Sequence, residues 1–262
     1  MSINFGIIGG SGLYNPKNIL EQRNVRTPFG KVLVKITEIN AKKIAFLARH
    51  GEKHSVPPHL INYNANIFAL HKLGVRKIIA SSAVGAIEDS LKPGDLVLPD
   101  QFIDFTLKRP RTFFDGKFKM ILHSGEKRSG VVHIDFTQPY CNNLRNELMK
   151  KAENDGSKIF PKGTYICTEG PRFETPAEID FYRKIGGAIV GMTSATECVL
   201  AKELGMCYAT ICLVTNYAAG MQAKISIEEV FSIFKEKGPL ILNLIEKTFE
   251  SMEISEKQCE CL

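Results

Sequence analysis

Six short segments of this 262-residue sequence follow apolar runs and are rich in glycine, small hydroxyls and arginine. They lie at residues 9–12, 49–51, 81–85, 168–175, 191–197 and 215–220. Ligands of open α/β sheets bind beyond the carboxyl ends of the strands, so these segments are the first candidates for a site. Their donors predict a site for an anionic, hydroxyl-rich ligand.

Phosphate is the anion that the first segments favour. Gly9-Gly10-Ser11-Gly12 is not a dinucleotide fingerprint, because Asn15 stands where the last glycine is required, and no P-loop lysine follows it. It could form a structural turn or a nest of N–H groups around an anion, with Ser11 adding a hydroxyl. Arg49 favours phosphate binding, because a guanidinium carries forked donors and a permanent charge. Thr193, at an expected helix start, would add the positive end of a helix dipole.

Three histidines lie close to Arg49 in the sequence: His50, His54 and His59. Pro57-Pro58 prevents them from sharing one helical face, and no nearby cysteine completes a ligand set, so we expect no metal. We expect His50 to contact phosphate and the other two histidines to be structural or surface residues.

Phe173, Glu174 and Asn216 favour a site for a planar base. An aromatic face can stack on a heterocycle, and a carboxylate and a carboxamide can read its edge. Each residue also has a structural interpretation, since phenylalanine is usually core, Glu174 could interact with a helix dipole, and Asn216 could simply end a strand. Their joint position after apolar runs favours the base site.

The elements that position these residues alternate along the chain. Apolar runs rich in β-branched residues predict strands at residues 5–8, 44–48, 76–80, 95–98, 163–167, 188–190 and 206–215. Several lack the period-two alternation of half-exposed strands, which indicates a sheet covered on both faces. We therefore predict one α/β domain over residues 1–250, with a largely buried central sheet flanked by helices.

Helix signals lie between these runs. Apolar residues at spacings of three and four predict a helix over residues 60–73. Capping boxes predict further helix starts at residues 175–178, 194–197 and 226–229. Gly238-Pro239 predicts a kink or a break in the last helix.

The composition limits the classes of function. With 44% hydrophobic and 24% charged residues the chain is globular, which excludes disordered, collagen-like and coiled-coil proteins. The net charge of +6 includes no basic run longer than residues 108–111, so we interpret it as a solvated surface and expect no nucleic-acid partner. No apolar run is long enough for a membrane span and no leader follows Met1, so we expect a cytoplasmic protein without membrane contact.

The sequence contains seven cysteines, an odd number. Five are scattered and expected to be reduced core residues: Cys141, Cys167, Cys198, Cys207 and Cys212. A bridge between Cys198 and Cys212 is expected only if the source is a hyperthermophile. Cys259 and Cys261, in a tail of residues 251–262, are candidates for redox or metal chemistry or else idle.

Seven ordered motifs carry a family resemblance. They are Gly9-Gly-Ser-Gly12, Arg49-His-Gly51, Asn62-Tyr-Asn-Ala-Asn-Ile67, Pro93-Gly-Asp95, Asp100-Gln-Phe-Ile-Asp104, Glu169-Gly-Pro-Arg-Phe173 and Gly191-Met-Thr193. Together they resemble the trimeric purine nucleoside phosphorylases, and within these the methylthioadenosine phosphorylase branch. The resemblance implies a nucleoside phosphorylase-like mixed sheet. It also implies phosphorolysis of a purine nucleoside to free base and sugar 1-phosphate, with phosphate as co-substrate and no cofactor.

The resemblance further implies residue roles. Phosphate would be held by Ser11, Arg49, His50, Ser82, Ala83 and Thr193. The base and ribose would meet Phe173, Glu174, Met192, Asn216 and Ala218. The 5′ group of the sugar would meet Ile227, Val230 and His133 of a neighbouring subunit. Asn216, Glu174 and His50 would act in catalysis, within a homotrimer that has its sites at the interfaces.

Two departures from the branch pattern concern the base. Methylthioadenosine phosphorylases carry Asp-x-Asp where this chain has Asn216-Tyr217-Ala218, and they lack the glutamate found here as Glu174. A hypoxanthine ring has a donor at N1, which Glu174 can accept, and an acceptor at O6, to which the Asn216 amide can donate. The edge of adenine reverses both groups, so the sequence predicts a 6-oxopurine nucleoside.

The 5′ pocket narrows the substrate further. Ile227 and Val230 would make it apolar, which fits a methylthio group better than a hydroxyl. We therefore expect S-methyl-5′-thioinosine, with inosine and guanosine as secondary substrates. S-methyl-5′-thioadenosine is the first alternative, a non-catalytic nucleotide-binding regulator the second, and a nonspecific nucleic-acid binder the last.

Overall fold

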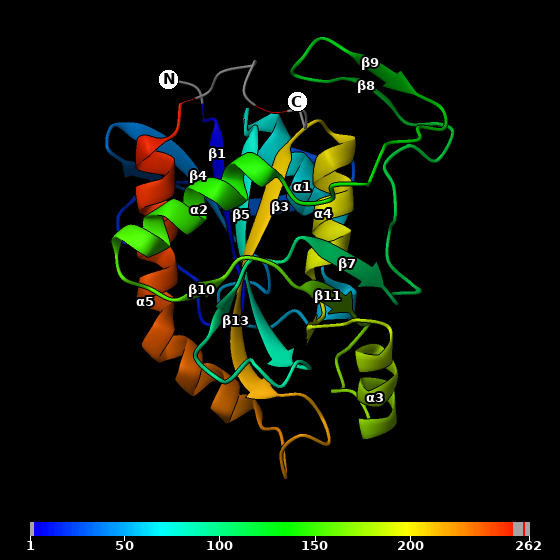
Figure 1. The fold of residues 1–262 in the computed structure, drawn as a ribbon. Coiled ribbons are helices and arrows are strands. Elements are labelled where there is room, and N and C mark those ends of the chain that lie inside the picture. The colour runs from blue at the N-terminus through cyan, green and yellow to red at the C-terminus, as the bar shows by residue number, and fades with distance from the viewer. Residues whose placement is uncertain (1–2, 254–258, 260–262) are drawn as a thin grey trace.

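Eleven strands form one mixed sheet in the computed structural model of the chain, which describes residues 3–253 and Cys259 (Figure 1). The main path runs β10 (Ile159–Phe160), β6 (Leu96–Val97), β13 (Cys207–Tyr217), β5 (Lys77–Ala86), β1 (Phe5–Gly9), β4 (Lys42–Ala48), β3 (Gly30–Ile39) and β2 (Ile19–Thr27). β12 (Ile189–Gly191) joins the end of β5 and pairs with β11 (Thr164–Cys167), which pairs with β7 (Gln101–Asp104). The sheet therefore forks where β5 ends.

Helices cover both faces of the sheet. α1 (Tyr63–Lys72) and α4 (Ser194–Glu203) pack on one face, and α2 (Asn142–Asn154) and α5 (Ile227–Ser251) on the other (Figure 1). β1 and nearly all of β13 are buried, as parallel strands covered on both sides must be. The predicted α/β architecture with a buried central sheet is confirmed.

The remaining elements lie at the periphery. α3 (Pro176–Lys184) follows β11, and a single 3-10 turn, η1 (Pro58–Leu60), precedes α1. β8 (Lys119–Ile121) and β9 (Lys127–Ser129) form a separate hairpin that extends away from the sheet (Figure 1). None of the helices in the described part of the chain has the length and apolar character needed to cross a bilayer.

Every apolar run predicted as a strand contains one, but the helix signals are only partly confirmed. The capping box at Thr175 is present, and the Ser226 side chain accepts from the Glu229 N–H. The capping box predicted at Ser194 is absent, because Thr193 is the N-cap of α4 and its side chain makes no capping hydrogen bond. α1 begins at Tyr63, later than predicted.

α5 is one helix that contains Pro239 in its interior, so the predicted break is absent. Figure 1 shows this helix bending along its length, which agrees with a kink. It ends at Ser251, and most of the predicted tail, with Cys261, lies outside the described residues.

Candidate active site

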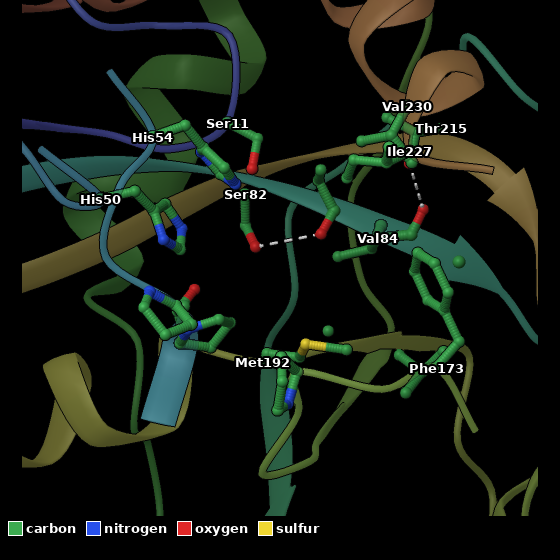
Figure 2. Close-up of a pocket in the computed structure, with 18 of the residues that line it drawn as sticks. Ser11, His50, His54, Ser82, Val84, Phe173, Met192, Thr215, Ile227 and Val230 are labelled. Carbon is green, nitrogen blue, oxygen red and sulfur yellow. Dashed lines mark hydrogen bonds between the residues drawn. The ribbon is translucent and has the colours of Figure 1, made fainter. Parts of the chain in front are cut away.

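A cavity of about 370 Å³ lies beyond the ends of β1, β4 and β12, along the final residues of β5 and β13 (Figure 2). Its volume is in the range of small-ligand sites. Of the predicted site residues, all but His133 and Ala218 line it. Figure 2 shows Ser11, His50 and Ser82 toward one end of the view and Phe173 toward the other.

Arg49, at the end of β4, is buried in an ion pair with Glu197 of α4. Nε lies 2.5 Å from Glu197 Oε1 and Nη2 lies 2.7 Å from Oε2, while Nη1 donates to the Ser81 carbonyl at 2.8 Å. Burial alone would lower the pKa of Arg49, but Glu197 holds this pKa above its ordinary value. The guanidinium therefore remains charged and fixed at the cavity wall.

His50 is neutral in this environment. Burial, together with the charge of Arg49, lowers the pKa of His50 to about 3. Its Nδ1 lies 2.8 Å from the Val56 carbonyl, which can only accept, so Nδ1 carries the proton. Nε2 of this tautomer is then a hydrogen-bond acceptor, suited to a protonated phosphate oxygen or a sugar hydroxyl.

Tyr165 organises two hydroxyl residues at the same end of the cavity. Its phenolic oxygen lies 3.3 Å from Ser82 Oγ and accepts from the Thr193 N–H at 3.3 Å. Thr193 begins α4 with a hydroxyl that is not used as a cap. The helix terminus and these hydroxyls give the cavity an environment that favours an anion.

The glycine loop after β1 serves close packing as well as binding. A Cβ on Gly10 would lie 2.5 Å from the Ser81 carbonyl oxygen, so only glycine fits there. The Gly10 N–H donates to Ser81 Oγ at 2.9 Å, which removes it from the predicted nest around an anion. Ser11 is the residue of this loop that lines the cavity.

Glu174 presents a carboxylate at the base end. Its Oε1 accepts from the Thr168 hydroxyl at 2.8 Å, which leaves further acceptor positions on the carboxylate. Burial raises the pKa of Glu174 above its ordinary value, although the Thr168 hydroxyl opposes this shift. A carboxylate with a raised pKa is a stronger hydrogen-bond acceptor for a ligand N–H.

Asn216 reaches the cavity through a bulge in β13. Val84 of β5 pairs with Val214 but Gly85 pairs with Asn216, so Thr215 is an extra residue, and both Thr215 and Asn216 line the cavity. The Asn216 Oδ1 accepts from the Thr215 hydroxyl at 2.9 Å, and Nδ2 donates to the Tyr217 carbonyl at 2.8 Å. These partners fix the amide orientation and leave one N–H of Nδ2 for a ligand.

The two side chains predicted to meet the 5′ group are apolar. Ile227 and Val230, from the first turns of α5, line the cavity, and Ile227 is 43% exposed. His133 does not line it but is exposed in the segment after the β8–β9 hairpin. Its predicted role in a neighbouring subunit therefore stays a prediction.

Ala218 is a correction to the predicted site. It is fully buried, its N–H donates to the Ala86 carbonyl, and it packs in the cluster that includes Ile179 and Val190. Its position immediately behind Gly85 makes it support for the cavity wall.

Three residues at or beside the cavity have positions or contacts that the sequence did not indicate. His54, expected to be a structural or surface residue, is half-buried and lines the cavity, with Nδ1 3.2 Å from the Tyr14 hydroxyl. Glu197 pairs with Arg49 and does not form a capping box. Arg109, interpreted as part of a solvated basic run, is buried. The partners of the last two are distant in the sequence, and no local pattern indicates them.

The cysteines in the described part of the chain do not line this cavity. Cys198 and Cys212 are buried thiols, and the conditional bridge between them is not formed. The sulfurs of Cys141, Cys207 and Cys259 lie within 4.8 Å of one another, on the face covered by α2 and α5. Cys259 thus lies beside two buried cysteines, whereas Cys261 is outside the described residues. The redox or metal chemistry of Cys259 stays a prediction.

The sequence and the structure are similar to those of known proteins. The chain matches the Phosphorylase superfamily over residues 4–248. It is 49% identical over 257 residues to the 6-oxopurine nucleoside phosphorylase of Pyrococcus furiosus, covering 97% of this chain and 95% of that protein. It is 45% identical over 261 residues to a probable S-methyl-5′-thioinosine phosphorylase of Methanothermobacter thermautotrophicus, covering 98% of this chain and 86% of that protein. A methylthioadenosine phosphorylase structure from an antarctic soil metagenomic library matches with a TM-score of 0.87 at 33% identity, covering 99% of this chain and 90% of that chain.

Proposed function

The chain belongs to the Phosphorylase superfamily, and from this membership we propose that it catalyses the phosphorolysis of 6-oxopurine nucleosides, with S-methyl-5′-thioinosine as the main substrate. The products are the free base and a ribose 1-phosphate that keeps its 5′ group. One observation supports the base assignment: Glu174 and Asn216 both line the cavity, Glu174 with a free acceptor position and Asn216 with a free N–H donor. This pair complements N1–H and O6 of a 6-oxopurine.

The mechanism stabilises charge at both ends of the breaking glycosidic bond. As this bond lengthens, the sugar gains oxocarbenium character and the base gains negative charge. Phosphate, placed beside Arg49 and Thr193, stabilises the sugar cation and then attacks C1′. The remaining N–H of Asn216 donates to O6 of the departing base, where negative charge accumulates.

His50 and Ser82 orient the phosphate in this proposal. A neutral His50 with its proton on Nδ1 accepts a hydrogen bond at Nε2 from a protonated phosphate oxygen. Ser82 can donate to another oxygen, because Tyr165 holds it at the cavity wall. No cofactor enters these steps, and we propose that phosphate is the only co-substrate.

Base release should therefore require phosphate, and the sugar product should be a 1-phosphate. We expect the highest initial rates with methylthioinosine, lower rates with inosine and guanosine, and still lower rates with methylthioadenosine and adenosine. Free base is measured by chromatography with and without phosphate. Equal rates without phosphate, with free sugar as product, would identify a hydrolase, and binding without base release would favour a regulator.

S-methyl-5′-thioadenosine is the second candidate substrate, because the apolar 5′ pocket of Ile227 and Val230 would accept its methylthio group equally well. The methylthioadenosine phosphorylase structure described above belongs to this specificity class. A higher kcat/KM for methylthioadenosine than for methylthioinosine would favour it.

We also propose a homotrimer in which each site is completed by His133 of a neighbouring subunit. Large apolar side chains are exposed near this histidine and elsewhere, including Val131 at 72% and Leu107 at 83% exposure. A subunit interface would remove these exposed apolar side chains from water. We further propose a cytoplasmic location, where the buried thiols of Cys198 and Cys212 stay reduced.

Subunit complementation should test the shared site. Glu174→Ala and His133→Ala variants are each expected to have low activity, since each lacks one part of every site. Co-expressed subunits should recover part of the activity, because a mixed interface contains one intact site. Each variant alone is the control. A wild type that sediments as a fully active monomer would contradict the proposal.

A further inference from the structure

Arg109 does not line the cavity, yet its side chain contacts segments that form the cavity walls. It lies in the loop after β7, and its side chain is only 1% exposed. We propose that Arg109 is a positioning residue that holds the ribose and base walls in one arrangement. This inference depends on the proposed function, which it extends to a residue beyond the cavity.

All five N–H groups of the Arg109 guanidinium have acceptors. Nε donates to Glu169 Oε1 at 3.2 Å. Nη1 donates to the Tyr63 hydroxyl at 3.0 Å and to the Met192 carbonyl. Nη2 donates to the carbonyls of Thr168, at 3.3 Å, and Glu169, at 2.7 Å. A fully satisfied, buried guanidinium has one orientation and fixes the groups that it joins.

Three of the four acceptor residues lead to residues that line the cavity. Met192, the predicted ribose contact, lines the cavity itself. Thr168 donates from its hydroxyl to the Glu174 carboxylate, so its backbone position sets the place of the base acceptor. Tyr63 donates to the Pro58 carbonyl at 2.9 Å, and Pro58 also lines the cavity. One side chain thereby couples three walls that come from distant parts of the sequence.

The Glu169 carboxylate also joins the loop that carries Arg109 to this hydrogen-bond network. Its Oε2 accepts from the backbone N–H groups of Leu107, at 2.7 Å, and Lys108, at 3.2 Å. Burial would raise the pKa of Glu169, but these N–H groups and Arg109 lower this pKa below its ordinary value. The carboxylate is thus charged at neutral pH and offsets the buried guanidinium.

A lysine could not replace Arg109 in this role. An ammonium group has three donors and is a compact point charge, whereas the guanidinium is a planar fork with five donors. Arg109→Lys would keep the charge beside Glu169 but leave at least two of the backbone and hydroxyl acceptors without a donor.

The test compares Arg109 with Arg111, two residues later in the same loop. Arg111 is exposed and donates to the Thr106 carbonyl, and it does not line the cavity, so Arg111→Lys and Arg111→Ala are matched controls. We expect Arg109→Ala to lower kcat/KM for the nucleoside by about 100-fold, since small misplacements of reacting groups have effects of this size. Arg109→Lys should also lower it, and by more than the loss of folded protein explains, which the melting temperature and the folded fraction at the assay temperature measure.

Chemical rescue separates positioning from a purely structural role. Guanidinium ion, at concentrations too low to unfold the wild type, should restore part of the Arg109→Ala activity but not that of Arg109→Lys, whose ammonium occupies the site. Sodium chloride at equal ionic strength should restore nothing. Activity of Arg109→Lys equal to that of Arg111→Lys, or a loss in Arg109→Ala that follows unfolding and is not rescued, would overturn the proposal.

Failure of the proposed function would give a different result. A wild type that releases no base from any nucleoside refutes phosphorolysis. Positioning is then decided by calorimetric affinity for hypoxanthine, which must fall in Arg109→Ala and recover with guanidinium. An unchanged hypoxanthine affinity would overturn the positioning role on its own.

Discussion

Asn216→Asp should reduce the preference for 6-oxo over 6-amino nucleosides, which we expect to be at least about 100-fold in the wild type. A buried site with fixed donors and acceptors rejects a ligand that reverses them, and such discrimination reaches about 10⁴. A ratio of 100 corresponds to about 2.7 kcal/mol. The variant loses the Nδ2 donor for O6 and offers an acceptor to a 6-amino group. The ratio of kcat/KM for inosine and adenosine measures this change.

This ratio also controls for damage to the fold. The new carboxylate would lie near the Tyr217 carbonyl that now accepts from Nδ2, so some loss of stability is expected. A loss of folded protein lowers both rates equally and leaves their ratio unchanged. If the ratio of the variant equals that of the wild type, Asn216 simply ends a strand and the specificity argument is wrong.

Glu174, the other residue proposed to contact the base edge, predicts a pH dependence of kcat/KM. Glu174 must be ionised to accept N1–H, and its pKa is raised, so kcat/KM for inosine should fall as the pH falls through this raised pKa. Above that pKa the carboxylate is present and kcat/KM should reach a plateau. Glu174→Gln should lower the plateau and abolish this acidic limb. An identical acidic limb in the variant would assign it to another group.

The sequence predicted the fully buried central strands and missed strands toward the edge of the sheet, such as β2. β1 and β13 consist almost entirely of buried apolar or small residues, and such runs have few alternative structures. β2 has the sequence ILEQRNVRT and is mostly exposed at the edge of the sheet, where it pairs with β3. Its residues do not form the continuous apolar run by which the buried strands were predicted.

The rule that ligands bind beyond the carboxyl ends of parallel strands predicted where the cavity lies. This rule selected segments that line the cavity, because parallel strands bring their carboxyl ends to one edge, while the phosphate and base roles of their residues stay predictions. Ala218 was assigned from the resemblance and not from this rule, and it lies behind Gly85 without lining the cavity. Glu197 and Arg109 were misinterpreted because their partners are far away in the sequence and become neighbours only in the folded chain.

The buried pair of Arg49 and Glu197 should affect stability and phosphate use in separable ways. Removal of one partner leaves the other charge buried and unpaired, which costs about 3–5 kcal/mol. We therefore expect Glu197→Gln and Arg49→Met each to lower the free energy of unfolding strongly in urea titrations. Tyr208→Phe, which removes only the hydroxyl that donates to Glu197, is the milder control.

The double variant Arg49→Met/Glu197→Gln distinguishes the two roles of this pair. Without either charge, no buried ion is left unpaired, so the double variant should be more stable than either single variant. Phosphate use should not recover, because charge-assisted donors contribute about 1.5–3 kcal/mol, or one to two orders of magnitude in kcat/KM for phosphate. Both quantities can be measured on the same preparations. Recovery of stability together with phosphate use would mean that Arg49 only supports the fold, and the anion would then depend on the other proposed phosphate residues, such as His50, Ser82 and Thr193.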